Sequence, residues 1–223
     1  MASDDDRNGD EDQEVAETPK LVSEEIARRE HQLLMEAAPT EVSDLASACV
    51  RFVTKAVGVQ LDYTVETLPI LDHYLAGARA VLAAKEVGEP LEVVAQTAGA
   101  YLGEVIRRRF PCFWVLTPAD PTEHRLQFMR LFLTVKPVAW VLDSLLLDPE
   151  KAQESLSGLV LDREDRDLCI GRLADLPEVT DEDFVRPSTR LEVLDLVVDA
   201  ITTKQSLNHE PALSLEEEDY LDG

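Results

Sequence analysis

The side chains most able to do chemistry gather in one short segment, between Gly99 and Arg109. The candidate site residues in it are Tyr101, Glu104, Arg107, Arg108 and Arg109. Side chains three or four positions apart on a helix face each other, so Glu104 can pair with Arg107 or Arg108. Three cations at the end of a helix also suit the negative end of its dipole. The pattern favours a charge cluster at a helix end, and the alternative is a site that binds an anion or a partner protein.

Two glycines in the same segment, Gly99 and Gly103, lie one helical turn apart. Each costs a helix about 1 kcal/mol relative to alanine, and each lets a neighbouring backbone come close. We expect this glycine face to be packed tightly by another element, with a bound ligand as the less favoured explanation.

The N-terminal stretch Asp4-x-Asp6-x-Asn8-Gly9 reproduces the first half of a calcium-binding EF-hand loop. The twelfth position of that loop needs a bidentate glutamate, and here it is Val15. Too few residues precede the stretch to form the entering helix. We therefore interpret it as an acidic tail and expect no metal site there.

Signatures of catalysis and of cofactor binding are missing from the chain. The sequence has no nucleophile elbow of the G-x-S-x-G type and no glycine-rich phosphate loop. The histidines and cysteines show no metal-ligand spacing; they are His31, His73, His124, His209, Cys49, Cys112 and Cys169. We expect free, buried cysteines, no cofactor, no metal and no enzymatic activity.

The charge of the chain restricts its partners. The formal net charge is −24, and residues 1–19 and 205–223 together carry 13 of these negative charges. Phosphate backbones and anionic lipids repel such a surface, so direct binding to nucleic acid or membrane is disfavoured. A basic protein partner is favoured. The N-terminus lacks the basic start and apolar run of a signal peptide, which predicts a cytoplasmic protein.

The elements that must position these residues are mostly helices. Apolar residues at helical spacing, with caps and prolines at the ends, predict seven helices, over about 23–38, 40–58, 64–85, 91–109, 137–145, 162–174 and 188–204. Phe113–Val115 and Leu126–Val135 favour one small β-hairpin, with a bulge near Met129; a helix over 126–135 stays open. The sequence thus predicts a predominantly helical α+β domain over residues 20–204, between disordered acidic tails at 1–19 and 205–223.

Two motifs resemble a family of uncharacterised bacterial proteins of unknown function. The first is Leu61-Asp62-Tyr63-x-x-Glu66-Thr67-Leu68-x-x-Leu71-Asp72-x-Tyr74-Leu75, and the second is Gly99-Ala100-Tyr101-Leu102-Gly103-Glu104-Val105. The resemblance covers residues 58–148. It implies a glycine-bearing helix, then a strand with Trp114, a second strand and a helix that starts at Pro137. It implies no activity.

The sequence leads to two hypotheses about function. The first is a non-enzymatic cytoplasmic protein that binds another protein, for instance an acidic inhibitor or immunity-type protein of a basic toxin. The second is an enzyme or small-ligand binder whose site lies near the Gly99–Arg109 helix and the hairpin. The second requires a pocket into which Glu104 and the arginines turn.

Overall fold

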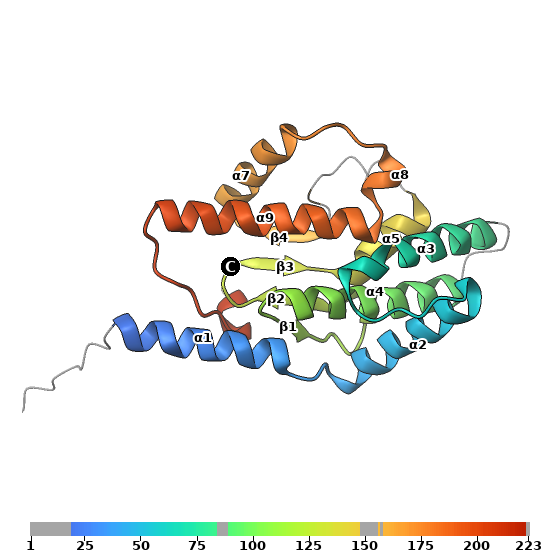
Figure 1. Cartoon of the computed structure of the whole chain (residues 1–223), viewed down its shortest axis with the longest axis horizontal. Coiled ribbons are helices and arrows are strands. Elements are labelled where there is room, and N and C mark those ends of the chain that lie inside the picture. Colours follow the sequence, from blue (N-terminus) through green and yellow to red (C-terminus); the bar gives the residue numbers. More distant parts are fainter. Residues whose placement is uncertain (1–18, 84–88, 148–155, 157, 222–223) are drawn as a thin grey trace, which may run out of the picture.

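The computed structural model describes residues 19–83, 89–147, 156 and 158–221. Its helices are α1 (Pro19–Met35), α2 (Thr40–Val57), α3 (Leu68–Ala83), α4 (Glu89–Arg109), α5 (Pro137–Leu146), α7 (Arg163–Ala174), α8 (Asp181–Phe184) and α9 (Pro187–Leu207). Its strands are β1 (Cys112–Val115), β2 (Arg125–Phe128), β3 (Leu133–Val135) and β4 (Leu159–Leu161). Three short 3₁₀ helices, η1 (Val65–Thr67), η2 (Pro121–Glu123) and η3 (Glu217–Tyr220), complete the described chain. Figure 1 shows this arrangement, and the predicted class, α+β with mostly helix, is confirmed.

All seven predicted helices are present, with small shifts at their ends. Asp162 caps α7 as expected, because its side chain accepts a hydrogen bond from the Asp165 amide at 2.9 Å. The last helix begins one residue earlier than predicted, with Pro187 in its first turn, where a missing N–H costs little. The added helix within the described residues is α8, a single turn capped by the Thr180 side chain.

The sheet is larger than the predicted hairpin. Its four strands pair antiparallel in the order β1-β2-β3-β4. Leu126–Val135 forms two strands joined by a turn, so the phase shift near Met129 marks a reversal of the chain instead of the predicted bulge. Strand β4 was not predicted. It has three residues and pairs with β3, and the shortest separation between partners, Val135 and Leu159, is 24 positions.

Helix α4 runs through the middle of the molecule, between α2 and α5 and beside the sheet (Figure 1). Every side chain from Thr97 to Arg107 is buried. A helix that neighbours cover on all sides has no solvent-facing stripe, which explains why polar Glu104 and Arg107 lie in the interior. Three of the predicted site residues, Tyr101, Glu104 and Arg107, are therefore positioned by the core, whereas Arg108 and Arg109 are exposed.

Arg190 and Asp143 form a buried ion pair between α9 and α5. Arg190 of α9 is 1% exposed, and its Nη2 lies 3.4 Å from Oδ2 of Asp143 in α5. The guanidinium also lies 4.5 Å above the ring of Phe184 in α8. Burial lowers the pKa of Arg190, and the charge of Asp143 opposes that effect. The pair fixes α5, α8 and α9 relative to one another.

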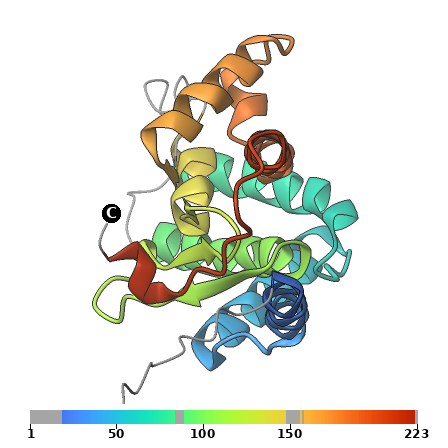
Figure 2. The ribbon, with the colours of Figure 1, turned by 90° about the vertical axis from the view of Figure 1, so that its left-hand side faces the viewer.

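The prediction of a disordered tail over residues 205–223 is wrong for the part that the structure describes. Helix α9 continues to Leu207, and the chain then crosses to the sheet, as Figure 2 shows. The Leu215 amide donates to the Met129 carbonyl at 2.8 Å. Two apolar anchors, Leu215 and Tyr220, dock this segment, and so sparse a pattern does not stand out in an acidic sequence. The predicted tail over 1–19 lies, except for Pro19, outside the described residues.

The Tyr220 hydroxyl occupies the turn between β2 and β3. It accepts hydrogen bonds from the amides of Phe128 and Leu133, at 3.1 and 3.3 Å. The carbonyl oxygens of Phe128 and Leu131 each lie 2.7 Å from it and compete for its single proton. This hydroxyl therefore ties the C-terminal segment to the backbone of the turn.

Candidate functional site

The predicted pairing of Glu104 is present, deep inside the molecule. Arg107 donates from Nε to Oε1 at 2.8 Å and from Nη2 to Oε2 at 3.0 Å. Trp114 of β1 donates its indole N–H to the same Oε1 at 2.9 Å. The third guanidinium nitrogen of Arg107 donates to the Leu33 carbonyl of α1 at 3.0 Å. One carboxylate and one guanidinium thus join α4, β1 and α1.

Burial and charge in this cluster reinforce each other. Glu104 is 3% exposed and Arg107 is 6% exposed. The hydrogen bonds that Arg107 donates to Glu104 raise the pKa of Arg107, against the effect of burial. A buried ion pair is tolerated when it is bidentate and when further hydrogen bonds engage its two partners. Here Trp114 binds the carboxylate of Glu104, and the Leu33 carbonyl binds the guanidinium of Arg107. The pair serves as an internal connection, and its groups face each other.

The remaining candidate residues also contact elements other than α4. Arg108 stays within ion-pair range of Glu104, with its Nε 3.9 Å from Oε2, and its guanidinium lies 4.0 Å above the Tyr63 ring. Arg109 pairs with Asp195 of α9 at 2.7 Å. Tyr101 is fully buried, and its hydroxyl lies 2.8 Å from Oγ1 of Thr67 and accepts from the Tyr63 amide at 3.0 Å. Burial raises the pKa of Tyr101. Arg108 and Tyr101 thus both join α4 to the segment around Tyr63, and Arg109 joins it to α9.

The two glycines do allow close packing, as predicted. A Cβ atom placed on Gly99 would lie 2.6 Å from the Val138 side chain of α5, and one on Gly103 would lie 2.2 Å from the Trp114 ring. Pro137, at the start of α5, lies beside the same Gly103 position at 3.2 Å. The glycine face therefore receives the first turn of α5 and the indole that binds Glu104.

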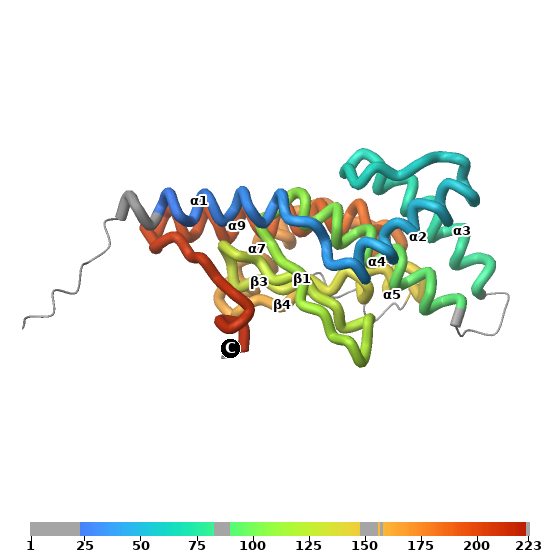
Figure 3. The backbone as a smooth tube through the Cα atoms, turned by 90° about the horizontal axis from the view of Figure 1, so that it is seen from below, coloured from blue at the N-terminus to red at the C-terminus, as the bar shows by residue number. Residues whose placement is uncertain are grey.

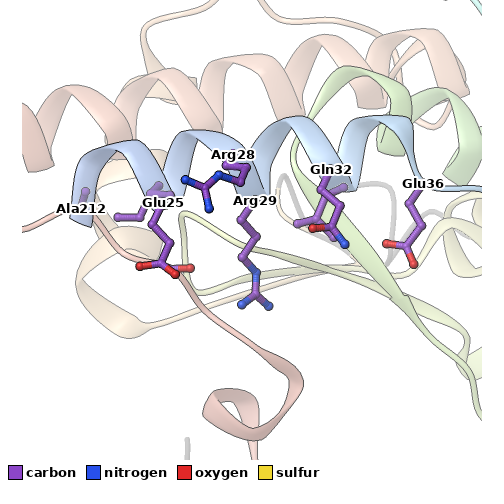
Figure 4. Close-up of a pocket in the computed structure, with 9 residues that line it drawn as sticks. Glu25, Arg28, Arg29, Gln32, Glu36 and Ala212 are labelled. Carbon is purple, nitrogen blue, oxygen red and sulfur yellow. The ribbon is translucent and has the colours of Figure 1, made fainter. Parts of the chain in front are cut away.

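The larger hollows of the described structure lie elsewhere. One of about 620 Å³ follows α1, which runs along the outer side of the molecule in Figure 3. In Figure 4 the side chains of Glu25, Arg29, Gln32 and Glu36 project to the same side of α1, and Ala212 lies near the Glu25 end of the helix. Its lining residues are Glu25, Ile26, Arg28, Arg29, Gln32, Leu33, Glu36, Ala212 and Ser214. Glu25 and Glu36 lie on either side of Arg28 and Arg29 in the sequence, and Arg29 pairs with Glu216, so the hollow offers no single charge to a ligand.

A second hollow, of about 460 Å³, lies where α3 meets the start of α9. Asp72 accepts hydrogen bonds from both the hydroxyl and the amide of Ser188, so a side chain of α3 caps α9. Burial raises the pKa of Asp72. Arg79, on the same wall, pairs with Glu182 of α8. The polar groups at this position join three helices, because Asp72 holds Ser188 of α9 and Arg79 binds Glu182 of α8.

The third hollow is a groove of about 610 Å³ formed by α7, the segment before α8, and α9. Its lining is eight apolar residues, one threonine and three acids, namely Leu173, Ala174, Leu176, Pro177, Glu178, Val179, Asp181, Phe184, Thr189, Glu192, Val193 and Leu196. Val193, at the base, is 7% exposed, whereas Leu176, Val179 and Leu196 are 44%, 54% and 41% exposed. The three acids are all exposed. An apolar base with an acidic edge is the arrangement of a binding surface.

The sequence analysis did not find this groove. The acids around residue 181 lie between the two predicted helices over 162–174 and 188–204. The available signal was the spacing of Leu173, Leu176 and Val179, three large apolar residues within an acidic stretch. Which of them would be covered depends on how α7 folds back along α9, and that contact lies outside any local pattern.

No family model, curated protein or solved structure matches this chain. The order of α4, the Trp114 strand and a helix starting at Pro137 agrees with what the resemblance to the uncharacterised bacterial proteins implies, but membership stays a prediction. Within the described residues, no helix is long and apolar enough to cross a membrane. The same part of the chain holds no cluster of three or more potential metal-binding side chains.

Proposed function

We propose that this protein acts without catalysis, by binding another protein whose contact surface is basic. The observation that carries the proposal is the groove between α7 and α9, with its apolar base and exposed acids. Protein interfaces combine a desolvated apolar centre with a polar edge, and exposed aliphatic side chains gathered around one hollow are typical of them.

Electrostatics support the same conclusion. A net charge of −24 attracts cationic partners over distances of about 10 Å at moderate salt and repels nucleic acid. Association of oppositely charged proteins is faster and weakens as salt rises. An inhibitor or immunity-type protein that neutralises a basic toxin in the cytoplasm is one concrete form of this function.

The second hypothesis, an enzyme or ligand-binding site at Glu104 and the arginines, receives less support from the geometry. It requires these groups to line a pocket. Glu104 instead accepts hydrogen bonds from Arg107 and Trp114. Arg108 lies over the Tyr63 ring, and Arg109 pairs with Asp195. None of the five candidate residues lines any of the three hollows described above. Leu33, whose carbonyl accepts a hydrogen bond from Arg107, lines the first of them.

A capture experiment tests the proposed function. The full chain is immobilised and exposed to a lysate of its own cells, at low and at high salt. An unrelated protein of similar negative charge serves as the control bait, to subtract simple cation exchange. We expect a partner that binds this chain alone and is released as salt rises. If both baits capture the same proteins, the proposal is wrong.

A further inference from the structure

From the geometry of the groove we infer what kind of segment it binds: an amphipathic helix of the partner that carries lysines or arginines on both sides of an apolar stripe. The inference rests on the proposed function and specifies the partner's chemistry at this site. It applies to the residues of α7, α8 and α9 that line the groove.

The first step concerns the face that α9 presents. Thr189, Glu192, Val193 and Leu196 line the groove and follow the spacing i, i+3, i+4 and i+7. This spacing places them on one face of a helix, the kind of stripe that normally packs against a second helix. Here the stripe is covered at Val193 and open at Leu196, which is 41% exposed. Another helix can complete this packing.

The second step concerns the charges at the edge. Glu178 and Asp181 lie on one wall and Glu192 on the other, all exposed. Two neighbouring acids, Glu182 and Asp183, pair with Arg79 and Arg186. By contrast, no ion pair within the described residues engages the three acids of the edge. They are therefore available to cations supplied from both sides of an inserted helix.

The positions of the charged groups favour a helix over a small molecule as the bound segment. Small-molecule sites place a few polar groups inside the cavity, where they fix the ligand's orientation. In this groove the charged groups stand at the exposed edge, and the base consists of Leu173, Phe184 and Val193. An amphipathic helix with an apolar stripe matches that distribution, since its cations reach the edge while its aliphatic side chains enter the groove.

The test uses a defined probe. A fluorescent peptide of about 14 residues, four helical turns, carries leucines on one face and lysines elsewhere. A second peptide keeps the leucines and replaces each lysine by glutamate. Binding to the full chain is followed by fluorescence anisotropy at low and high salt, and amide chemical shifts locate the bound peptide. We expect the lysine peptide to bind with shifts over residues 173–196, and the glutamate peptide not to bind.

Two groove variants and two controls separate shape from charge. Val179→Ser with Leu196→Ser removes exposed aliphatic contacts and should weaken the lysine peptide roughly tenfold or more. Glu178→Gln with Glu192→Gln should weaken it mainly at low salt. Val59→Ser and Glu66→Gln alter exposed residues away from the groove and should change the affinity less than about twofold. All six substituted side chains are exposed, so the variants keep the fold, which circular dichroism checks.

The outcomes distinguish this inference from the proposed function. Lysine-peptide binding that ignores the Val179 and Leu196 substitutions would show general attraction to an acidic protein and would overturn the inference, as would the absence of binding. A captured partner that binds the groove variants normally leaves the proposed function standing and rejects the groove as its site. If the lysine peptide binds and the groove substitutions weaken it, but the lysate yields no partner, the helix-binding groove stands and the proposed function is rejected.

Discussion

Replacing Glu104 by glutamine tests the interpretation of the buried cluster as a structural connection. The substitution keeps the shape of the side chain and one acceptor oxygen but removes the charge that faces Arg107. Arg107 is 6% exposed, so its guanidinium keeps the Leu33 carbonyl and loses its counter-charge in an apolar interior. Breaking one side of a buried ion pair costs about 3–5 kcal/mol, and the remaining acceptor returns roughly 1 kcal/mol. We expect Glu104→Gln to lower the free energy of unfolding by about 3 kcal/mol.

Urea unfolding of the full chain, followed by circular dichroism, measures this change. The slope of unfolding free energy against urea should stay constant, which shows that the native state keeps its compactness. Arg109→Gln is the matched control, because its pair with Asp195 is half-exposed and should contribute less than about 1 kcal/mol. The double variant Glu104→Gln/Arg107→Met should lose less than the sum of the single losses, by about 1 kcal/mol or more. A loss below about 1 kcal/mol for Glu104→Gln, or strict additivity, would refute the reasoning.

Three further predictions concern other contacts. Tyr220→Phe removes the hydroxyl from the β2–β3 turn and should cost about 1–3 kcal/mol in urea unfolding, with faster amide exchange at the turn and not in α4. Gly103→Ala forces a methyl group into Trp114 and should destabilise by about 1–3 kcal/mol, whereas Gly171→Ala, whose added Cβ meets nothing within 4 Å, should stabilise by about 0.5–1 kcal/mol; equal effects on the melting temperature would contradict the packing argument. Burial raises the pKa of the Cys169 thiol to about 11, so at pH 8 it stays protonated, and a thiol reagent should label it only as urea unfolds the chain; fast labelling of the native protein would show that the site is open.

The helices could be predicted because their signals are local. These signals act within a few residues of one another. They are the helical spacing of apolar residues along α4, the capping aspartate at position 162 and the proline at 137. Sheet pairing was less accessible, since β4 has three residues and finds its partner 24 or more positions back. The docking of Tyr220 depends on a turn some 90 residues earlier, which no local pattern encodes.

The candidate site divides in the same way. The pairing of Glu104 with Arg107 follows from helical spacing and was predicted, as was close packing at Gly99 and Gly103. The contributions of Trp114 and the Leu33 carbonyl come from other elements, so the sequence could not show that the cluster is closed to ligands. The groove beside α9 arises only from tertiary packing.

The contact between Arg29 and Glu216 has a consequence for synthesis of the chain. These residues are 187 positions apart, and Tyr220, just after Glu216, contacts the Leu131 carbonyl of the β2–β3 turn 89 positions earlier. At translation rates of about 5–20 residues per second, roughly 10–40 seconds pass between the appearance of α1 and that of the acid that binds it. During that interval α1 is without its contact to Glu216, although the residues of α4 that it contacts are already present. The contacts of Leu215, Glu216 and Tyr220 can form only after these residues have been synthesised, so this segment docks on a surface that the earlier part of the chain supplies.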